Sequence, residues 1–500
     1  MFIWAKVISA QKGRPGRSAR CTRERGAVCP RPVTGPFHQQ GRAFGATAAN
    51  HHRCCCALIV GLAGREWARW VRQRRIATQR QRCDTRGMAA IVASHNLEVS
   101  MSLPRVDALP DVAADPRLAW TLSARAYTDR QIFESERQRV FASTWQPVAS
   151  LDRLQQPGQQ LACQVAGWPL VVLRDEQGRL RAFHDVCRHR AGPLTDGPGR
   201  VCQRKTLQCR YHGWTYSLDG RLLHTPGLRE PAVEPASGPV APILVRDDFS
   251  LQPVDVASFG PLVFVRLRQP APSLPGALGL LEGLGELPAE VAAYADLATV
   301  LYEKREYIVE CNWKVYVDNY LEGYHIPMVH PALMRELDYP LYRVEPRAYH
   351  SRQYAPIRAL PTGTNPAAAH AVGREYLPSE GQGAAAYYWV FPNLMLNYYP
   401  DHLQVNVVLP ISVDRTAVLF EWYFADDGSA EQQQKQRRRI EFADQVQRED
   451  ATICQAVQQR LATGLYDRGR FVPEQEAGVH HFQRLVLRSL QGASDDGRSE

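Results

Sequence analysis

Residues 187–194 read Cys-Arg-His-Arg-Ala-Gly-Pro-Leu, and residues 209–216 read Cys-Arg-Tyr-His-Gly-Trp-Thr-Tyr. Each stretch supplies one thiol and one imidazole, and nineteen residues separate the first imidazole from the second thiol. Glycines beside both pairs favour the tight loops that would bring the two side chains together. In a chain that shows no secretory signal, this pattern indicates a metal site rather than a disulfide framework. The four candidate ligands are Cys187, His189, Cys209 and His212.

Two kinds of metal site use two thiolates and two imidazoles. In a Rieske-type [2Fe–2S] cluster, two Cys bind one iron and two His bind the other. A structural zinc site of the Cys2His2 type places the same ligands around one ion. The Cys-x-His spacing of the first pair and the short spacing of the second pair are unlike those of usual zinc sites, so the sequence favours the cluster.

Both stretches resemble the Rieske domain of the α-subunits of non-haem iron oxygenases. The resemblance implies one [2Fe–2S] cluster per chain, held by the four ligands named above. The surrounding sequence has the alternating pattern and turn signals of an all-β module. Its predicted strands cover residues 160–165, 170–174, 180–186, 206–209, 214–217, 221–224 and 262–267.

A second group of candidate ligands follows the Asn-Trp-Lys sequence at residues 312–314. The pattern predicts a helix from residue 312, on which Glu322 and His325 are three residues apart and share a face. Pro327 should interrupt this helix, which would allow His330 to turn towards His325. Two neutral imidazoles with a nearby carboxylate form the facial triad of non-haem Fe(II), which leaves positions open for O2 and substrate.

The carboxylate of this triad is sought in a long helix predicted over residues 430–462. An apolar stripe at helical spacing passes through it, at Val446, Ile453, Val457 and Leu461. Asp450 is inserted into this stripe, and a buried carboxylate is costly unless it is paired or bound to metal. The alternative is that Asp450 pairs with an arginine or lies at the helix surface. Glu449 is a neighbour with a weaker claim, because its phase on the helix is less suitable.

The segment at residues 318–330, Asp-Asn-Tyr-Leu-Glu-Gly-Tyr-His-Ile-Pro-Met-Val-His, resembles the catalytic segment of Rieske oxygenase α-subunits. The Glu449-Asp450 pair is similar to their late acidic pair, and the resemblance covers about residues 115–490. It implies one Fe(II) per chain, bound by His325, His330 and Asp450.

The same resemblance implies a catalytic acid and an assembly. Glu322 takes the place of the acid that bridges to the cluster-bearing His of a neighbouring subunit. Asp318, which lies on the same helical stripe, is predicted from the sequence to be a second catalytic residue. A ring-like homotrimer is implied, in which the cluster of one subunit serves the iron of the next.

The expected reaction is oxygen insertion into a C–H or C=C bond, so the chain is predicted to be a Rieske non-haem iron mono- or dioxygenase. The cluster would pass electrons singly, and the iron needs two of them to activate O2. The sequence contains no G-x-G-x-x-G dinucleotide fingerprint. We therefore expect NAD(P)H electrons to come from a separate reductase, directly or through a ferredoxin. An electron-transfer Rieske protein without oxygenase activity is the alternative from another class, although such proteins are much shorter.

The substrate is the least determined feature. Residues 387–400 concentrate aromatic side chains and resemble the corresponding segment of quaternary-ammonium oxygenases of the choline monooxygenase type. An aromatic cage would bind a trimethylammonium group by cation–π attraction. Aromatics at alternating spacing are also typical of a sheet core. The prediction is a choline- or betaine-type substrate, and the alternative is an aromatic ring, attacked by a ring-hydroxylating dioxygenase.

The predicted fold class is α+β. A Rieske domain with an N-terminal helix is expected over residues 115–268, and a catalytic domain over residues 289–490. A Pro/Gly/Leu-rich stretch at residues 269–288 is expected to be a linker or an irregular connector. The resemblance implies that the catalytic domain has a central antiparallel sheet of the helix-grip, START-like type. Strands are predicted over residues 299–311, 403–410 and 417–424.

The charge is unevenly distributed along the chain. Residues 1–100 hold 18 Lys and Arg but only 4 Asp and Glu, whereas the rest of the chain holds 42 and 47. This basic leader has neither periodicity nor a binding motif, so we expect it to be disordered or to precede the true start, for which Met88 and Met101 are candidates. The alternative function of a zinc-bearing nucleic-acid binder is favoured only by the positive charge of this leader. No apolar run is long enough to cross a bilayer, so the predicted location is cytoplasmic, without nucleic-acid or membrane partners.

Overall fold

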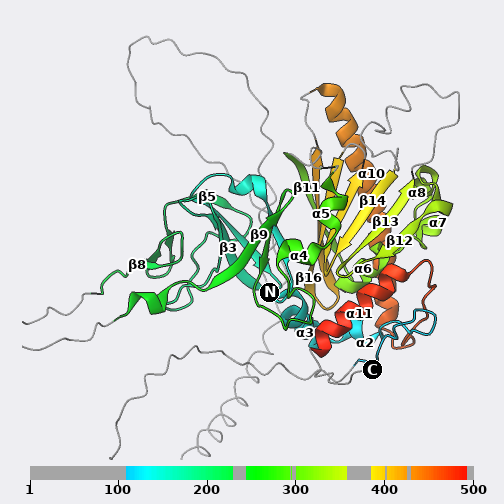
Figure 1. The fold of residues 1–500 in the computed structure, drawn as a ribbon, viewed down its shortest axis with the longest axis horizontal. Coiled ribbons are helices and arrows are strands. Elements are labelled where there is room, and N and C mark those ends of the chain that lie inside the picture. Colours follow the sequence, from blue (N-terminus) through cyan, green and yellow to red (C-terminus); the bar gives the residue numbers. More distant parts are fainter. Residues whose placement is uncertain are drawn as a thin grey trace, which may run out of the picture. The chain divides into compact units, whose positions relative to one another are not determined.

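The computed structural model describes residues 109–228, 244–292, 294, 300–356, 384–399, 402–424 and 429–492. All of them belong to one compact unit, Val99–Glu500. The predicted leader and both candidate starts lie outside the described residues. Two seven-stranded antiparallel sheets and one three-stranded sheet organise the unit (Figure 1).

The first sheet has the strand order β1-β10-β9-β4-β3-β2-β5. Its strands are β1 (Gln146–Ser150), β2 (Gln159–Val165), β3 (Trp168–Arg174), β4 (Leu180–His184), β5 (Val201–Gln203), β9 (Pro253–Phe259) and β10 (Leu262–Arg266). Successive side chains of β3 point to opposite faces, so that Leu170 and Val172 enter one hydrophobic core while Val171 and Leu173 enter another. The second of these cores also contains the three-stranded sheet, which consists of β6 (Leu207–Gln208), β7 (Thr215–Tyr216) and β8 (Leu222–His224).

The second sheet has the order β11-β17-β16-β15-β14-β13-β12. Its strands are β11 (Val300–Val309), β12 (Arg343–Pro346), β13 (His350–Pro356), β14 (Ala384–Val390), β15 (Leu394–Tyr399), β16 (His402–Ser412) and β17 (Arg415–Phe424). The three strands predicted in this region are therefore confirmed, together with the α+β class.

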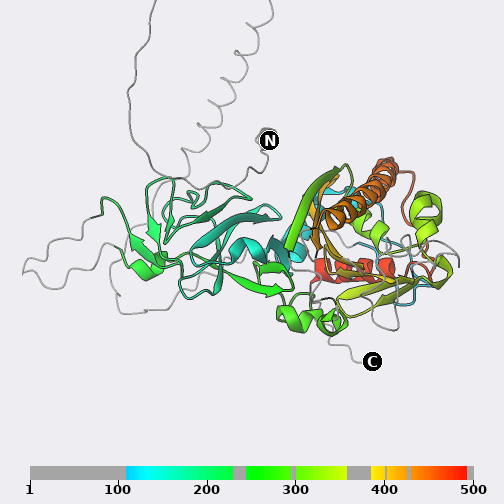
Figure 2. The ribbon, with the colours of Figure 1, turned by 90° about the horizontal axis from the view of Figure 1, so that it is seen from above.

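Helices pack around the second sheet, and the longest of them, α10, runs alongside it in both views (Figure 1 and Figure 2). The α-helices are α2 (Arg125–Thr128), α3 (Arg130–Glu136), α4 (Leu280–Leu284), α5 (Leu287–Glu290), α6 (Trp313–Tyr320), α7 (Ile326–Val329), α8 (Pro331–Glu336), α10 (Ala430–Leu461) and α11 (Ala477–Gln491). A π-helical turn follows α3 at η1 (Arg137–Phe141), and 3-10 turns form η2 (Leu151–Leu154), η3 (Arg246–Phe249) and η5 (Tyr339–Leu341). Asn312 and Ser429 cap α6 and α10 by accepting backbone N–H groups of the first turn.

Two sequence predictions about the helices are wrong. The connector at residues 269–288 is not wholly irregular, because it contains α4 and the start of α5. The expected apolar stripe of α10 is not its buried face, since Ile453 and Val457 are 36% and 41% exposed. The buried positions of α10 are mostly polar, at Gln436, Ile440, Asp444, Gln447, Cys454 and Gln458. Within the described part of the chain, no helix combines the length and apolar character that crossing a membrane requires.

Candidate metal centres

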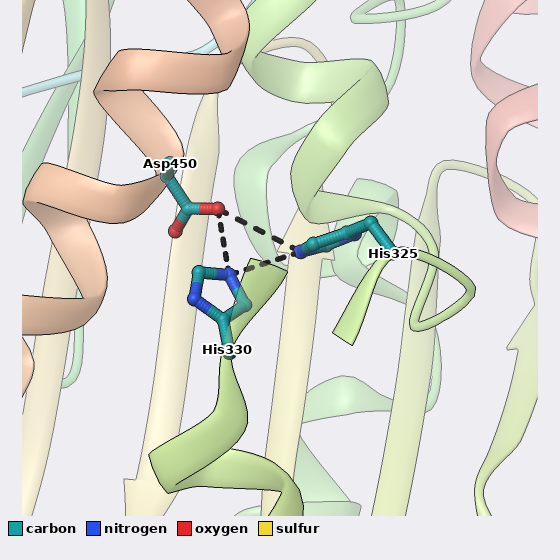
Figure 3. Close-up of side chains that lie close together, drawn as sticks. All are labelled: His325, His330 and Asp450. Carbon is teal, nitrogen blue, oxygen red and sulfur yellow. Dashed lines mark hydrogen bonds and ion pairs between the residues drawn. The ribbon is translucent and has the colours of Figure 1, made fainter. Parts of the chain in front are cut away.

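Three side chains, two of them five residues apart and the third on α10, converge beside the second sheet (Figure 3). The Nε2 atoms of His325 and His330 lie 3.1 Å apart. Oδ1 of Asp450 lies 2.9 Å from Nε2 of His330 and 3.6 Å from Nε2 of His325. The structure thus brings together the three residues that the sequence predicts as a triad, with all ligand atoms within 4.8 Å of one another.

These separations are suited to a single metal ion. Two ligand atoms at right angles, each about 2.1 Å from a metal, lie about 3.0 Å from each other. Two imidazoles and one carboxylate on one side of an ion, with the other side open, form the ligand set of mononuclear non-haem Fe(II). The donor atoms and their spacing therefore fit an iron that can still bind O2 and act on a substrate.

The backbone conformation around the two histidines differs from the prediction. Helix α6 ends at Tyr320, so Glu322 and His325 do not share a helix face. His325 instead occupies the N-cap position of the short helix α7, and Pro327 lies in the first turn of that helix, where its missing N–H costs nothing. His330 joins α7 to α8 with non-helical backbone angles. The predicted interruption is therefore real, but it begins before Glu322 rather than at Pro327.

A carboxylate holds each imidazole on the side opposite the triad. Nδ1 of His325 lies 2.5 Å from Glu322, which also accepts the backbone N–H of His325 at 2.9 Å. Nδ1 of His330 lies 2.7 Å from Glu449. Because a carboxylate favours a proton on the nearer ring nitrogen, both Nε2 lone pairs are left free for a metal.

Asn319 fixes the third member of the triad by donating to Oδ1 of Asp450 at 2.7 Å. Neither this contact nor the contact of Glu449 with His330 is predicted from the sequence. The adjacency of Glu449 to Asp450 was the one available signal, and it was interpreted as weak competition for the metal. In the structure, the two neighbouring acids of α10 contact different nitrogens of the same imidazole.

Asp318, which the sequence predicts as a catalytic acid, is not among the residues that line the cavity at the triad. Its carboxylate accepts hydrogen bonds from the Tyr127 hydroxyl at 2.6 Å and from Gln483 at 3.2 Å. Desolvation raises the pKa of Asp318 to about 7, although both donors act in the opposite direction. These contacts connect α6 with α2 and α11.

A cavity of about 110 Å³ adjoins the triad. This volume is below the roughly 300–1,000 Å³ of pockets for drug-sized ligands, so it suits a small molecule. Seven tyrosine and phenylalanine side chains contribute to its wall, Tyr316, Tyr320, Tyr342, Tyr387, Tyr399, Phe420 and Phe442. The described lining residues include no lysine or arginine.

The aromatic segment at residues 387–400 divides between the cavity and the sheet core. Tyr387 and Tyr399 line the cavity and meet edge to face, with ring centroids 5.8 Å apart. Tyr388, Trp389 and Tyr398 are instead buried in hydrophobic cores. Part of this segment therefore lines the cavity, as an aromatic cage would, and part of it forms the core of the sheet.

The second group of predicted ligands also pairs in space. Cys187 and Cys209 are buried, and the neighbouring Cys209 thiol adds to the effect of burial in raising the pKa of the Cys187 thiol. The rings of His189 and His212 lie 4.7 Å apart. The triad is the one described group in which three or more potential ligand atoms meet within 4.8 Å, so these four do not converge on one point as zinc would require. Thiol beside thiol and imidazole beside imidazole fit a cluster with two Cys on one iron and two His on the other.

The loops of this centre leave little room for change. A Cβ at Gly192 would lie 2.8 Å from Sγ of Cys209 and 2.9 Å from Cβ of Tyr211, so a side chain there would force the ligand loops to shift. The Tyr216 hydroxyl lies 3.1 Å from Sγ of Cys187, a contact that the sequence did not predict. The ring of His189 stacks on Trp214 at 4.7 Å and is exposed, whereas both thiols are buried. The imidazole side of the centre thus faces outward.

Comparisons with known proteins agree with both centres. Residues 144–244 match the family model of the Rieske [2Fe-2S] domain, and residues 295–492 match that of the ring hydroxylating alpha subunit (catalytic domain). Choline monooxygenase of Arabidopsis thaliana is 32% identical over 77% of this chain and 89% of the relative. The oxygenase subunit of carnitine monooxygenase of Escherichia coli is 29% identical over 78% of this chain and 98% of the relative.

Solved structures show the same architecture. The chain superimposes on a quaternary ammonium Rieske monooxygenase with a TM-score of 0.63 and 25% identity, covering 77% of this chain and all of that one. Naphthalene 1,2-dioxygenase from Rhodococcus shares the fold, with a TM-score of 0.55 and 20% identity over 75% of this chain and 95% of that one.

The predicted family, enzyme class and cofactors are therefore confirmed. The chain is an oxidoreductase that takes O2, an organic substrate and electrons from a reductase, and it carries a [2Fe–2S] cluster and a mononuclear iron. It belongs to the Rieske non-haem iron oxygenases, as their α-subunit with both the Rieske and the catalytic domain.

Proposed function

We propose that this oxygenase hydroxylates a small quaternary ammonium compound of the choline or betaine type at an iron bound by His325, His330 and Asp450. The observation that carries the proposal is the small aromatic cavity that adjoins these three side chains. Its aromatic faces attract a desolvated cation, and the lining carboxylates of Glu322 and Asp450 add negative charge. Relatives that act on choline and on carnitine support the same substrate class.

An iron held by His325, His330 and Asp450 would supply O2 activation and oxygen insertion with electrons from the cluster, and the residues around the triad position its ligands. Glu449 and Glu322 hold the two imidazoles in the tautomer that presents Nε2. Asn319 keeps Oδ1 of Asp450 directed at the same point. The aromatic wall excludes water from the reacting end of the substrate.

The cluster is assigned to Cys187, His189, Cys209 and His212, and the exposed imidazole edge is where we expect electrons to enter and leave. Glu322 is proposed as the acid that connects the imidazole edge of a neighbouring subunit to His325, within a homotrimer. A ferredoxin between reductase and cluster, and a cytoplasmic location, belong to the same proposal. Asp318 would act at a distance, by anchoring α6, rather than by touching the substrate.

Two domains are proposed, with boundaries near residues 115–268 and 289–490. The family matches at residues 144–244 and 295–492 support this order. The helices that precede the first sheet also contact the second region, because Trp313 of α6 donates to Glu136 of α3 at 2.8 Å.

The test is a substrate panel with the full chain and a compatible reductase. Choline, glycine betaine, carnitine and benzoate are compared by substrate-stimulated O2 consumption and by product analysis. The proposal predicts stimulation and hydroxylated product with at least one quaternary ammonium compound and not with benzoate. Product from benzoate alone would instead favour an aromatic-ring dioxygenase, and equal responses to all four compounds would leave no role for the cage.

A further inference from the structure

One buried polar group at the cavity takes no part in holding the triad. Gln447 lies on α10, three residues before Asp450, and its side chain lines the cavity. The residue is 1% exposed. The Tyr316 hydroxyl donates to Oε1 of Gln447 at 2.5 Å, while Nε2 has no hydrogen-bond partner. Among the described residues that line the cavity, no other fully buried side-chain nitrogen or oxygen lacks a partner.

Other amides at this cavity are engaged by the protein. Asn397 accepts the Tyr320 hydroxyl at 2.5 Å. Gln404 accepts the indole N–H of Trp422 at 3.0 Å and donates to Asn406 at 2.9 Å. Because a buried amide donor without a partner is unfavourable, an unpaired N–H beside the reacting centre indicates a partner that arrives with the substrate.

The charges of the wall restrict what that partner is. The described lining carries carboxylates but no lysine or arginine. A substrate carboxylate that does not reach the iron would therefore meet acids, amides and phenols without a lysine or arginine to pair with it, and a buried unpaired charge is strongly disfavoured. A hydroxyl needs only one neutral donor or acceptor.

We propose that Gln447 is a specificity-determining residue that donates its Nε2–H to the hydroxyl oxygen of the substrate, so that the enzyme prefers a quaternary ammonium alcohol to a quaternary ammonium carboxylate. This inference rests on the proposed function. Because the torsion about the last side-chain bond of an amide is broad, a partial rotation that keeps Oε1 within reach of the Tyr316 hydroxyl would turn the covered nitrogen towards the cavity.

The experiment measures dissociation constants on the iron-loaded full chain by titration calorimetry. The ligands are choline, ethyltrimethylammonium, which lacks only the hydroxyl, and glycine betaine, which carries a carboxylate. We expect choline to bind about tenfold more tightly than either of the other two, as one hydrogen bond to a buried donor allows. The replacement Gln447→Met should raise the dissociation constant of choline about tenfold and leave that of ethyltrimethylammonium unchanged.

The matched control is Gln436→Met. Gln436 lies on the same helix, is equally buried at 1% exposure, has two unpartnered side-chain atoms and does not line the cavity. This variant should keep the preference for choline. If Gln447→Met does not fold, the dissociation constants of the three ligands on the unaltered enzyme decide whether the substrate hydroxyl is recognised.

The outcomes separate the two proposals. If choline keeps its tenfold advantage in Gln447→Met, or if glycine betaine binds the unaltered enzyme as tightly as choline, this inference is overturned while the proposed substrate class stands. If none of the three cations binds, the proposed function fails and the inference fails with it.

Discussion

At the scale of single residues, Asp450 differs from other acids of α10 in position rather than in chemistry. Asp444, six residues earlier, is also poorly exposed, but it accepts the Tyr307 hydroxyl at 2.8 Å and pairs with Arg305 at 3.3 Å. Asp450 faces two imidazoles instead. The first carboxylate is neutralised by the protein, whereas the second is arranged for a metal.

This contrast makes a direct prediction. Asp450→Ala should remove about one third of the iron per chain, leave the sulfide content unchanged and lower product formation more than about a hundredfold, because one ligand of the triad is lost. Metal analysis and product assay measure both effects. Asp444→Ala is the control and should keep its full iron content. A full iron content in the Asp450 variant would refute the ligand assignment.

Asp318 gives a prediction about pH. The pKa of the Asp318 carboxyl is about 7 in the folded protein, against an ordinary value of 3.8. Between these two pH values the folded protein keeps a proton that the unfolded chain releases. The free energy of unfolding therefore falls as pH rises through this window and levels off above pH 7. Relative to Asp318→Asn, the unaltered protein should lose about 2–3 kcal/mol between pH 5 and pH 7.5. Denaturant unfolding of both proteins at the two pH values measures this, and a constant difference would contradict it.

Single residues were predictable from sequence to different degrees. Cys187, His189, Cys209 and His212 could be found because the chemistry of a cluster demands paired ligands in short loops. Gln447 and Glu449 could not, since a polar residue on a long helix is equally compatible with solvent. Their roles depend on which side of α10 meets the sheet, and that side was predicted wrongly from Ile453 and Val457.

At the scale of elements, a buried ion pair connects α3 with α6. Nζ of Lys314 lies 2.6 Å from Glu136, and both side chains are 0% exposed. Burial lowers the pKa of Lys314 and raises that of Glu136, and their mutual attraction opposes both changes. Nζ of Lys314 also donates to Oδ1 of Asn312, and the indole N–H of Trp313 donates to Oε2 of Glu136. The packing of α6 against α3 therefore depends on the charges of Lys314 and Glu136, one helix away from the iron ligands.

Breaking this pair should be costly, while replacing both members should not. Glu136→Leu alone is expected to lower the free energy of unfolding by about 3–5 kcal/mol, because it leaves a buried unpaired ammonium group. Adding Lys314→Met should restore most of that loss. Urea denaturation of the two single variants and the double variant gives the coupling. A double variant as unstable as the sum of the singles would rule out the pair as the cause.

The elements themselves were well predicted where alternation or length was strong, as in β3, β17 and α10. The end of α6 was not, because the chain leaves the helix at Leu321 without a proline or glycine at that position. Contacts distant in sequence hold the following segment, among them Gln353, which donates to the backbone oxygen of Tyr320 at 2.7 Å. Such tertiary contacts have no local signature.

At the scale of the whole molecule, oxygenase activity requires two separate metal centres in one chain. Their order along the sequence was predictable, because each motif is local. The shape of the substrate cavity was not, since its wall combines side chains from α6, several strands of the second sheet and α10.

The most direct test is the iron and acid-labile sulfide content of the purified full chain, measured together with the EPR spectrum of the reduced protein. The account predicts about three iron and two sulfide per chain and the signal of a mixed Cys/His [2Fe–2S] cluster. Two iron and two sulfide in fully loaded protein would show that the triad binds no iron and would contradict the oxygenase assignment. Zinc without sulfide would contradict both centres.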